Sequence, residues 1–237
     1  MTRIIVAIGF LLFSIVPAAG TYAYDGAAVS HGGTIEGVVK FKGTAPAPKK
    51  INVTKDTAVC GKTTKTDQSL IVSNGEVEDA VVYIADIKKG KPMSPSEVKL
   101  DQRDCEYHPH VLAFNAGSTV DVINPDGILH NIHSYSKVNT PFNFAQPKFK
   151  KTLNVKIEKP EIINIKCDVH SWMNGWLFSA ANPYFSVTGH DGSFKLTDVP
   201  PGTYTLTVWH DTLGKLSQKV TVKPNQETKV TFELAQK

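Results

Sequence analysis

Three side chains with metal-binding chemistry lie close together in the segment CDVHSWM. Cys167, His170 and Met173 offer a thiolate, an imidazole and a thioether. Soft sulfur ligands favour Cu(I), imidazole also serves Cu(II), and a weak axial thioether is typical of electron-transfer copper sites. Upstream, the stretch NPDGILHNIH adds His130 and His133. The sequence therefore predicts one copper ion per chain, with the ligands His130, Cys167, His170 and Met173.

Predicted strands lie on both sides of these candidate ligands. The apolar run EIINIKC ends at Cys167, and the run GWLFSA follows the loop. The stretch that contains His130 follows another predicted strand, STVDVINP. Ligands on a loop between two strands are held in place by rigid elements, which suits a metal site.

The first 23 residues have the pattern of a secretory signal peptide. A basic Arg3 precedes an apolar run from Ile4 to Val16, and small residues precede an expected cut after Ala23. The apolar run is too short to span a bilayer comfortably, so we expect cleavage rather than an anchor. An uncleaved signal anchor is the alternative. The expected product is an exported, periplasmic protein with no membrane span after cleavage.

The chain has three cysteines, an odd number. If Cys167 binds a metal, Cys60 and Cys105 remain, and two such cysteines in an oxidising compartment tend to form a disulfide. The bridge would close a loop of about 45 residues and stabilise the fold by roughly 4 kcal/mol in the chain-entropy model. The alternative is three unrelated buried thiols.

Composition and charge are those of an ordinary soluble globular protein, with 41% hydrophobic residues and a formal charge of +4. Lysines are spread along the chain, and no arginine-rich cluster occurs. We therefore expect no nucleic-acid binding. The mild positive charge suggests only that partners are acidic.

Strand patterns dominate the chain, and no segment has a sustained helical period, which predicts an all-β fold. The run AVVYIADI is typical of a strand buried on both sides. Between HVLAFNAG and STVDVINP, the residues Asn115–Ala116–Gly117 have the pattern of a hairpin turn. From about Asn182 onward, four or five short strands form a compact unit. One apolar face of it is marked by Val220, Val222, Val230, Phe232 and Leu234. We expect two domains, residues 24–181 and 182–237.

These motifs resemble two known families. The segment from about Thr34 to Ala181 resembles a cupredoxin, because HNIH is similar to the first-histidine motif and Cys-x-x-His-x-x-Met is similar to the short metal loop of amicyanin. The tail resembles a carboxypeptidase regulatory-like or transthyretin-like module, whose common trace is PPGTYTL. Together they resemble bacterial periplasmic plastocyanin-like proteins. The implied fold is a Greek-key β-sandwich followed by a small C-terminal β-sandwich.

The resemblance also implies roles for single residues. It identifies His130, not His133, as the first ligand, and it implies that the backbone amide of Asn131 points toward the sulfur of Cys167. Strand alternation also places His133 on the face opposite His130. Trp172 is expected beside the loop as packing or as part of an apolar docking rim. The implied function is that of a one-electron carrier that docks transiently with periplasmic redox proteins near His170.

An enzyme is not expected. Catalytic copper proteins relay electrons through histidines next to the ligand cysteine, whereas Cys167 has Lys166 and Asp168 as neighbours. A single loop cysteine excludes a dinuclear centre, and methionine is a poor zinc ligand. The alternatives are a protein that buffers or delivers copper and a metal-free structural module. With only three methionines, the chain lacks the Met-rich tracts of delivery proteins.

Three further histidines are candidates for lesser roles. His108 and His110 flank Pro109 and could form a surface metal site, although a strand edge explains them equally well. His210 follows Trp209, and we expect it to pack or to form hydrogen bonds near the interface between the domains.

Overall fold

The computed structural model describes residues 24–236, so the expected signal peptide at residues 1–23 lies outside the described residues. Strands dominate the described part, and its helices are single turns, α1 (Thr57–Cys60) and η1 (Arg103–Cys105). The all-β expectation is therefore confirmed. In this part of the chain, no helix has the length and apolar character needed to cross a membrane.

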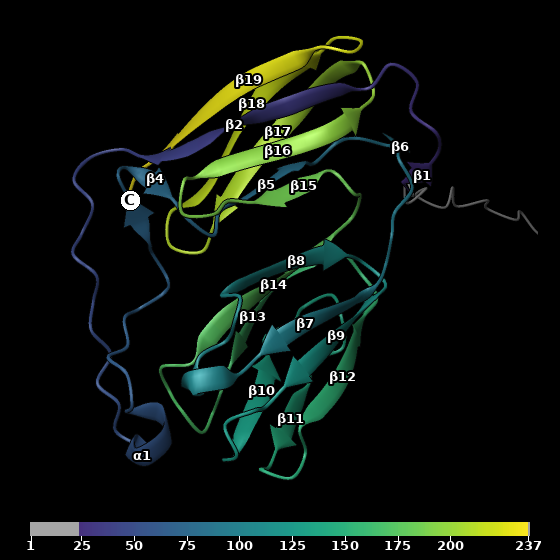
Figure 1. Cartoon of the computed structure of the whole chain (residues 1–237). Helices are drawn as coiled ribbons and strands as arrows, with labels where there is room; N and C mark the ends of the chain where they lie inside the picture. The colour runs from purple at the N-terminus through teal and green to yellow at the C-terminus, as the bar shows by residue number, and fades with distance from the viewer. Residues whose placement is uncertain (1–23, 237) are drawn as a thin grey trace, which may run out of the picture.

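Two β-sandwiches stacked end to end make up the molecule (Figure 1). The lower one, here called the metal-loop sandwich, comprises β7 (Glu97–Asp101), β8 (Val111–Asn115), β9 (Ser118–Ile123), β10 (His130–Ser134), β11 (Asn143–Gln146), β12 (Thr152–Ile157), β13 (Glu161–Lys166) and β14 (Asn174–Ala180). Its sheets have the orders β11-β10-β13-β14-β8 and β12-β9-β7. Buried side chains from both sheets, such as Val120 and Ile163, form one core.

The upper sandwich, here called the module, combines strands from both ends of the chain. Its strands are β2 (Gly33–Phe41), β3 (Val72–Ser73), β4 (Glu76–Val77), β5 (Val81–Ile84), β15 (Phe185–Val187), β16 (Ser193–Val199), β17 (Gly202–His210), β18 (Gly214–Val222) and β19 (Glu227–Leu234). One sheet has the order β15-β5-β17-β18, and the other has the order β16-β2-β4-β3 with β19 also paired to β2. A short parallel pair, β1 (Asp25–Gly26) and β6 (Lys89–Gly90), lies outside both sandwiches.

This strand pairing differs from the expected division at residues 181 and 182. Strand β2 pairs with β16 and β19, and β5 pairs with β15 and β17. The N-terminal strands thus complete the module, and the metal-loop sandwich is inserted between them and the C-terminal strands. The five C-terminal strands alone would leave the apolar face from Val220 to Leu234 without the β2 and β5 side chains that cover it.

Close contact between β2 and β19 requires a glycine at position 37. A Cβ atom there would overlap the carbonyl oxygen of Val230 on β19. The parallel pairing runs from Thr34 opposite Glu227 to Phe41 opposite Leu234, so the whole length of β2 depends on this approach.

The expected hairpin at Asn115–Ala116–Gly117 is wrong. Strand β8 pairs in parallel with β14, whereas β9 pairs with β12 and β7 in the opposite sheet. The turn therefore passes from one sheet of the sandwich to the other. Gly117 adopts a φ of +87°, which suits the sharp change of direction but does not decide which strands pair.

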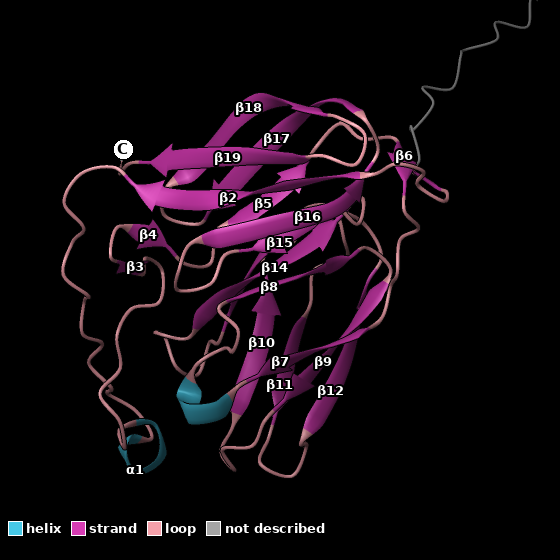
Figure 2. Ribbon diagram, turned by 45° about the horizontal axis from the view of Figure 1, so that its top comes forward, coloured by secondary structure: helices cyan, strands magenta, loops and turns pink. Residues whose placement is uncertain are grey.

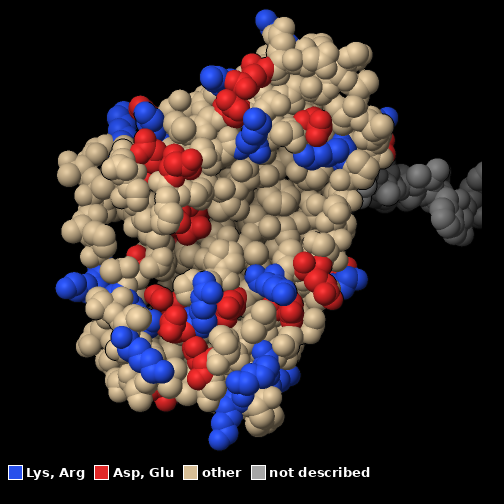
Figure 3. All heavy atoms as spheres, in the orientation of Figure 1, with Lys and Arg blue, Asp and Glu red and all other residues tan. Residues whose placement is uncertain are grey.

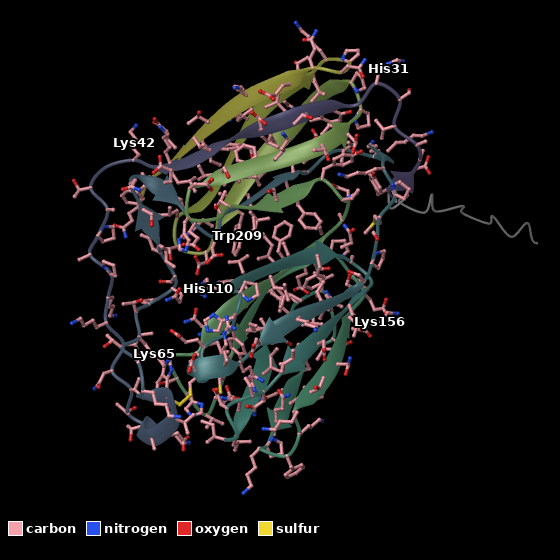
Figure 4. All side chains as sticks on the ribbon, in the orientation of Figure 1. His31, Lys42, Lys65, His110, Lys156 and Trp209 are labelled. Carbon is pink, nitrogen blue, oxygen red and sulfur yellow. A yellow bond between two sulfur atoms is a disulfide. The ribbon has the colours of Figure 1, made fainter. Side chains whose placement is uncertain are left out.

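An apolar layer joins the module to the metal-loop sandwich. Val81, Phe178 and Trp209 are buried together in a cluster that is separate from both sandwich cores. Strand β5 is buried on both faces, as expected, because Val81 faces this layer while Val82 and Ile84 face the module core. In Figure 4, Trp209 is labelled on the module side of this layer and His110 on the side of the metal-loop sandwich.

A long connection between β2 and β3, residues 42–71, leaves the module and runs down to the far end of the metal-loop sandwich (Figure 2). We call it the arm. Its two halves pair through backbone bonds between Ile51 and Lys65 and between Lys49 and Asp67, and α1 lies at its tip. Figure 1 shows α1 beside the metal-loop sandwich and far from the strands that precede and follow it in the chain.

Candidate metal centre

Three of the four predicted ligands converge at the lower end of the metal-loop sandwich. His130 begins β10, Cys167 follows β13, and His170 lies in the loop that leads to β14. One ligand atom from each lies within 4.8 Å of the other two, and all three side chains are buried. His130 and His170 are about 40 residues apart in the sequence, and pairing of β10 with β13 brings them together.

The spacing of the donor atoms suits a single metal ion. His170 Nδ1 lies 3.1 Å from His130 Nδ1 and 3.8 Å from Cys167 Sγ. Donors that share an ion at about 2.0–2.3 Å lie about 3–4 Å from one another. Two imidazole nitrogens with lone pairs facing each other also repel unless a proton or a cation lies between them. The donor set therefore fits a bound metal.

Carboxylates bind the outer nitrogens of both imidazoles. His130 Nε2 lies 2.9 Å from Asp126 Oδ2, and His170 Nε2 lies 2.9 Å from Asp56 Oδ2. An ionised carboxylate only accepts, so each Nε2–H donates and each neutral ring keeps its lone pair on Nδ1. Both rings are thus held with Nδ1 toward Cys167.

The electrostatics of the centre favour a thiolate. Burial alone would raise the pKa of Cys167, but contacts with His130 and His170 and a hydrogen bond from the backbone of Asn131 lower it to about 6. For His130, burial alone would lower the pKa, but contacts with Asp126 and Cys167 outweigh burial and raise that pKa. A thiolate is the form of cysteine that binds metals.

The loop from Cys167 to Met173 is tightly closed. The Cys167 amide donates to the Met173 carbonyl at 3.1 Å, and the Met173 amide donates to the His170 carbonyl at 2.9 Å. Met173 is buried in the same core as Cys167. The side chain of Asn131 accepts from the Asp168 amide at 2.6 Å, and this bond ties the strand that begins at His130 to the loop.

Trp172 packs against the ring of His170. Its ring centroid lies 5.3 Å from that of His170, and its Nε1 donates to the carbonyl of Cys105 at 3.1 Å. The disulfide between Cys60 and Cys105 is present, which confirms the predicted pair, and Cys167 is the free thiol. Both disulfide sulfurs lie within 4.8 Å of a ring nitrogen of His170, but they are bonded to each other and so are not free to bind a metal.

The expected docking point at the edge of His170 is covered. The imidazole of His170 is 0% exposed, because the arm places Asp56 over its Nε2. Sequence reasoning missed this contact, since 114 residues separate the two and no local pattern connects them. It also missed Asp126, although that residue precedes His130 by four positions and the spacing was visible.

The remaining histidines lie away from the three converging donors. His133 is 32% exposed on the opposite face of β10 and contacts Asp168 at 3.1 Å. The expected alternative of a surface pair is not formed, because His110 is buried against Asp211 while His108 faces Glu106. His210 is buried, and its Nδ1 accepts the amide of Thr212, in agreement with a packing and hydrogen-bonding role.

Comparison with known proteins gives separate results for the two sandwiches. Residues 180–235 match the model of the carboxypeptidase regulatory-like domain. The expected resemblance of the tail is therefore confirmed. The strands β2 and β5, which complete the module, lie outside the matched residues. No curated protein sequence matches the chain.

Solved structures similar to this chain include cupredoxins, the family that the metal-loop motif resembles. A purple cupredoxin from Nitrosopumilus maritimus is 22% identical over 35% of this chain and 99% of its own, with a TM-score of 0.31. An amicyanin variant in the Cu(I) state is 18% identical over 35% of this chain and 82% of its own, with a TM-score of 0.32. A copper-containing nitrite reductase from Thermus scotoductus is 21% identical over 41% of this chain and 25% of its own, with a TM-score of 0.31.

Proposed function

We propose that this protein binds one copper ion and carries single electrons between redox partners in the periplasm. The convergence of His130, Cys167 and His170 in a buried, thiolate-favouring centre is the observation that supports this function most directly. No reaction on a substrate is proposed, because the ligand set leaves no open position on the metal.

Each predicted ligand has a distinct role in this proposal. His130 Nδ1, His170 Nδ1 and the Cys167 thiolate are the strong donors. Met173 is the weak axial ligand that favours Cu(I) and raises the reduction potential. The copper ion would supply reversible one-electron chemistry. The β-strands on either side of the loop would keep the donor positions similar in both oxidation states, which favours fast transfer.

An absorption spectrum of the copper-loaded protein tests this function. A thiolate-to-Cu(II) band is expected in the visible, and Cys167→Ser should abolish it because the thiolate is the charge-transfer donor. His130→Ala should also remove or strongly alter the band. His133→Ala is the matched control, because this exposed imidazole lies on the other face of β10.

Two outcomes would contradict the proposal. Absence of stoichiometric copper would favour the metal-free structural alternative. A band that survives His130→Ala but is lost in His133→Ala would mean that the first ligand is assigned wrongly.

Docking of redox partners is proposed on the surface around the covered His170. A groove there combines apolar and basic side chains from the arm and from loops of the metal-loop sandwich; they include Lys55, Ile128, Leu129, Lys148, Phe149 and Val169. Phe149 is 81% exposed. An apolar centre with a basic rim suits a small, transient interface with an acidic redox protein.

A further inference from the structure

Both proposed imidazole ligands have an aspartate on the ring nitrogen that points away from the other donors. The two contacts, Asp126 with His130 and Asp56 with His170, have the same length of 2.9 Å. They come from parts of the chain that are far apart, since Asp126 lies in the loop before β10 and Asp56 lies at the tip of the arm. The shared arrangement suggests a shared purpose at the two rings.

Asp126 is held rigidly. Its side chain is 8% exposed. Its Oδ1 accepts the amide of Asp104, and its Oδ2 accepts the amide of Cys105, both at 2.8 Å. Two backbone amides and the first ring therefore hold this carboxylate in place beside His130.

The side chain of Asp56 makes no capping bond to α1, so it is free to contact His170, and the arm fixes its position. Four residues further on, Cys60 is joined to Cys105, which anchors the tip of the arm next to His170. The arm is fastened a second time by Lys65, whose fully buried side chain lies 3.4 Å from Glu106. Figure 4 shows Lys65 between the arm and the metal-loop sandwich. Asp56 itself is 37% exposed, so solvent screens its charge more than that of Asp126.

We propose that Asp56 and Asp126 are positioning residues that orient the two imidazoles toward copper and lower the reduction potential of the site. This inference rests on the proposed function. A carboxylate that accepts the outer N–H makes the ring a stronger electron donor and fixes its tautomer. A stronger donor and a nearby negative charge both stabilise Cu(II) more than Cu(I). Asp126 has the larger effect, because its charge is less screened.

The test replaces each carboxylate by the amide of the same shape and measures the reduction potential by voltammetry. Asp126→Asn and Asp56→Asn should each weaken Cu(II) relative to Cu(I). Outer-sphere changes of this kind typically cost about 10- to 100-fold in metal affinity. A tenfold loss of affinity for Cu(II) alone corresponds to a rise of about 59 mV in the reduction potential.

Asp104→Asn is the matched control. It removes an exposed negative charge from the same region without removing a partner of either ring, and its positive φ of 55° suits asparagine. Its potential should stay near that of the unchanged protein. Equal potentials in all four proteins would overturn the inference, and so would a rise of the same size in the control.

Proton NMR of the metal-free protein provides a readout that does not depend on copper. Two slowly exchanging imidazole Nε2–H resonances are expected, and each Asp→Asn variant should shift or lose one of them. Absence of both resonances would overturn the inference. Failure of the unchanged protein to form the visible band would instead overturn the proposed function. If Asp126→Asn does not fold, Asp56→Asn, on the more exposed arm, still decides the outcome.

Discussion

Met173 differs from the other three predicted ligands in how it is expected to act. His130, Cys167 and His170 have donor atoms that converge. Met173 lies at the end of the same loop, which two backbone hydrogen bonds close. A thioether is a soft donor that binds Cu(I) relatively better than Cu(II). The axial position is therefore where a single side chain can shift the potential without removing the metal.

Replacement of Met173 by Gln should lower the reduction potential. The amide oxygen is a harder donor than the thioether and prefers Cu(II), while Cys167 still provides the visible band. Voltammetry measures the shift, and a chelator-exchange assay on the same variant measures retention of copper. Met93→Gln, in the connection between β6 and β7, is the control for a general effect of losing a methionine. Unchanged potential with faster copper release would support the copper-delivery alternative.

At the scale of elements, the arm links the module to the candidate metal centre. It leaves the module after β2, lies against the metal-loop sandwich through the Cys60–Cys105 bridge, and returns to β3. Its tip covers His170, which sequence reasoning expected to be the exposed edge of the site. The arm therefore places part of the N-terminal region beside the candidate metal centre.

Cys60→Ser with Cys105→Ser should loosen the arm. The chain-entropy model predicts a loss of at most roughly 4 kcal/mol in the free energy of unfolding. Copper should also exchange faster with a chelator, because Asp56 no longer holds His170 from outside. Denaturant unfolding of the metal-free protein and the exchange assay measure the two effects separately. Lower stability with unchanged exchange would mean that the bridge stabilises the fold without holding the arm over the ring.

The whole molecule is held together by the layer between the sandwiches, where apolar and titratable groups meet. Trp176 and Trp209 contact edge to face at 5.2 Å, and Asp211 accepts Trp176 Nε1 at 3.1 Å. Figure 3 shows charges of both signs scattered over the two halves of one face, with a largely uncharged band between them.

Burial of Asp79 beside this layer raises its pKa to about 6. Glu78 and Asp211 add to the rise, and His110 and His190 oppose it.

This raised pKa predicts that Asp79→Asn stabilises the protein at neutral pH. A carboxyl whose pKa is higher in the folded state contributes stability below its unfolded pKa of 3.8, and that contribution is lost as the pH rises through about 6. The variant should therefore exceed the unchanged protein by about 3 kcal/mol at pH 7. The difference should shrink toward zero as the pH falls below 4.

Thermal unfolding of metal-free protein at pH 4 and pH 7 measures this difference. Asparagine tolerates the positive φ of 59° at position 79, so the backbone should not oppose the change. Asp25→Asn, at an exposed carboxylate that pairs with Lys89, is the control. If Asp79→Asn changes the stability by the same amount at pH 4 and pH 7, ionisation of Asp79 does not destabilise the folded protein, and the prediction is wrong.

Local pattern in the sequence was sufficient for strand content, the disulfide and the candidate ligands. Alternating apolar residues determine which face of a strand is buried, as the buried side chains from Val220 to Leu234 show. The loop ligands were recognisable because Cys167, His170 and Met173 lie on one short segment. An odd cysteine count, together with one ligand cysteine, predicted the Cys60–Cys105 pair.

Only the tertiary structure decided which strands share a sheet and what surrounds the candidate site. Alternation is the same for a strand in either sandwich, so it could not show that β2 pairs with β19 across most of the chain. The turn at Gly117 was misread for the same reason, because a turn signal does not specify which strands pair. Asp56 reaches His170 across 114 residues through the path of the arm, and this contact depends on long-range packing rather than on any local pattern.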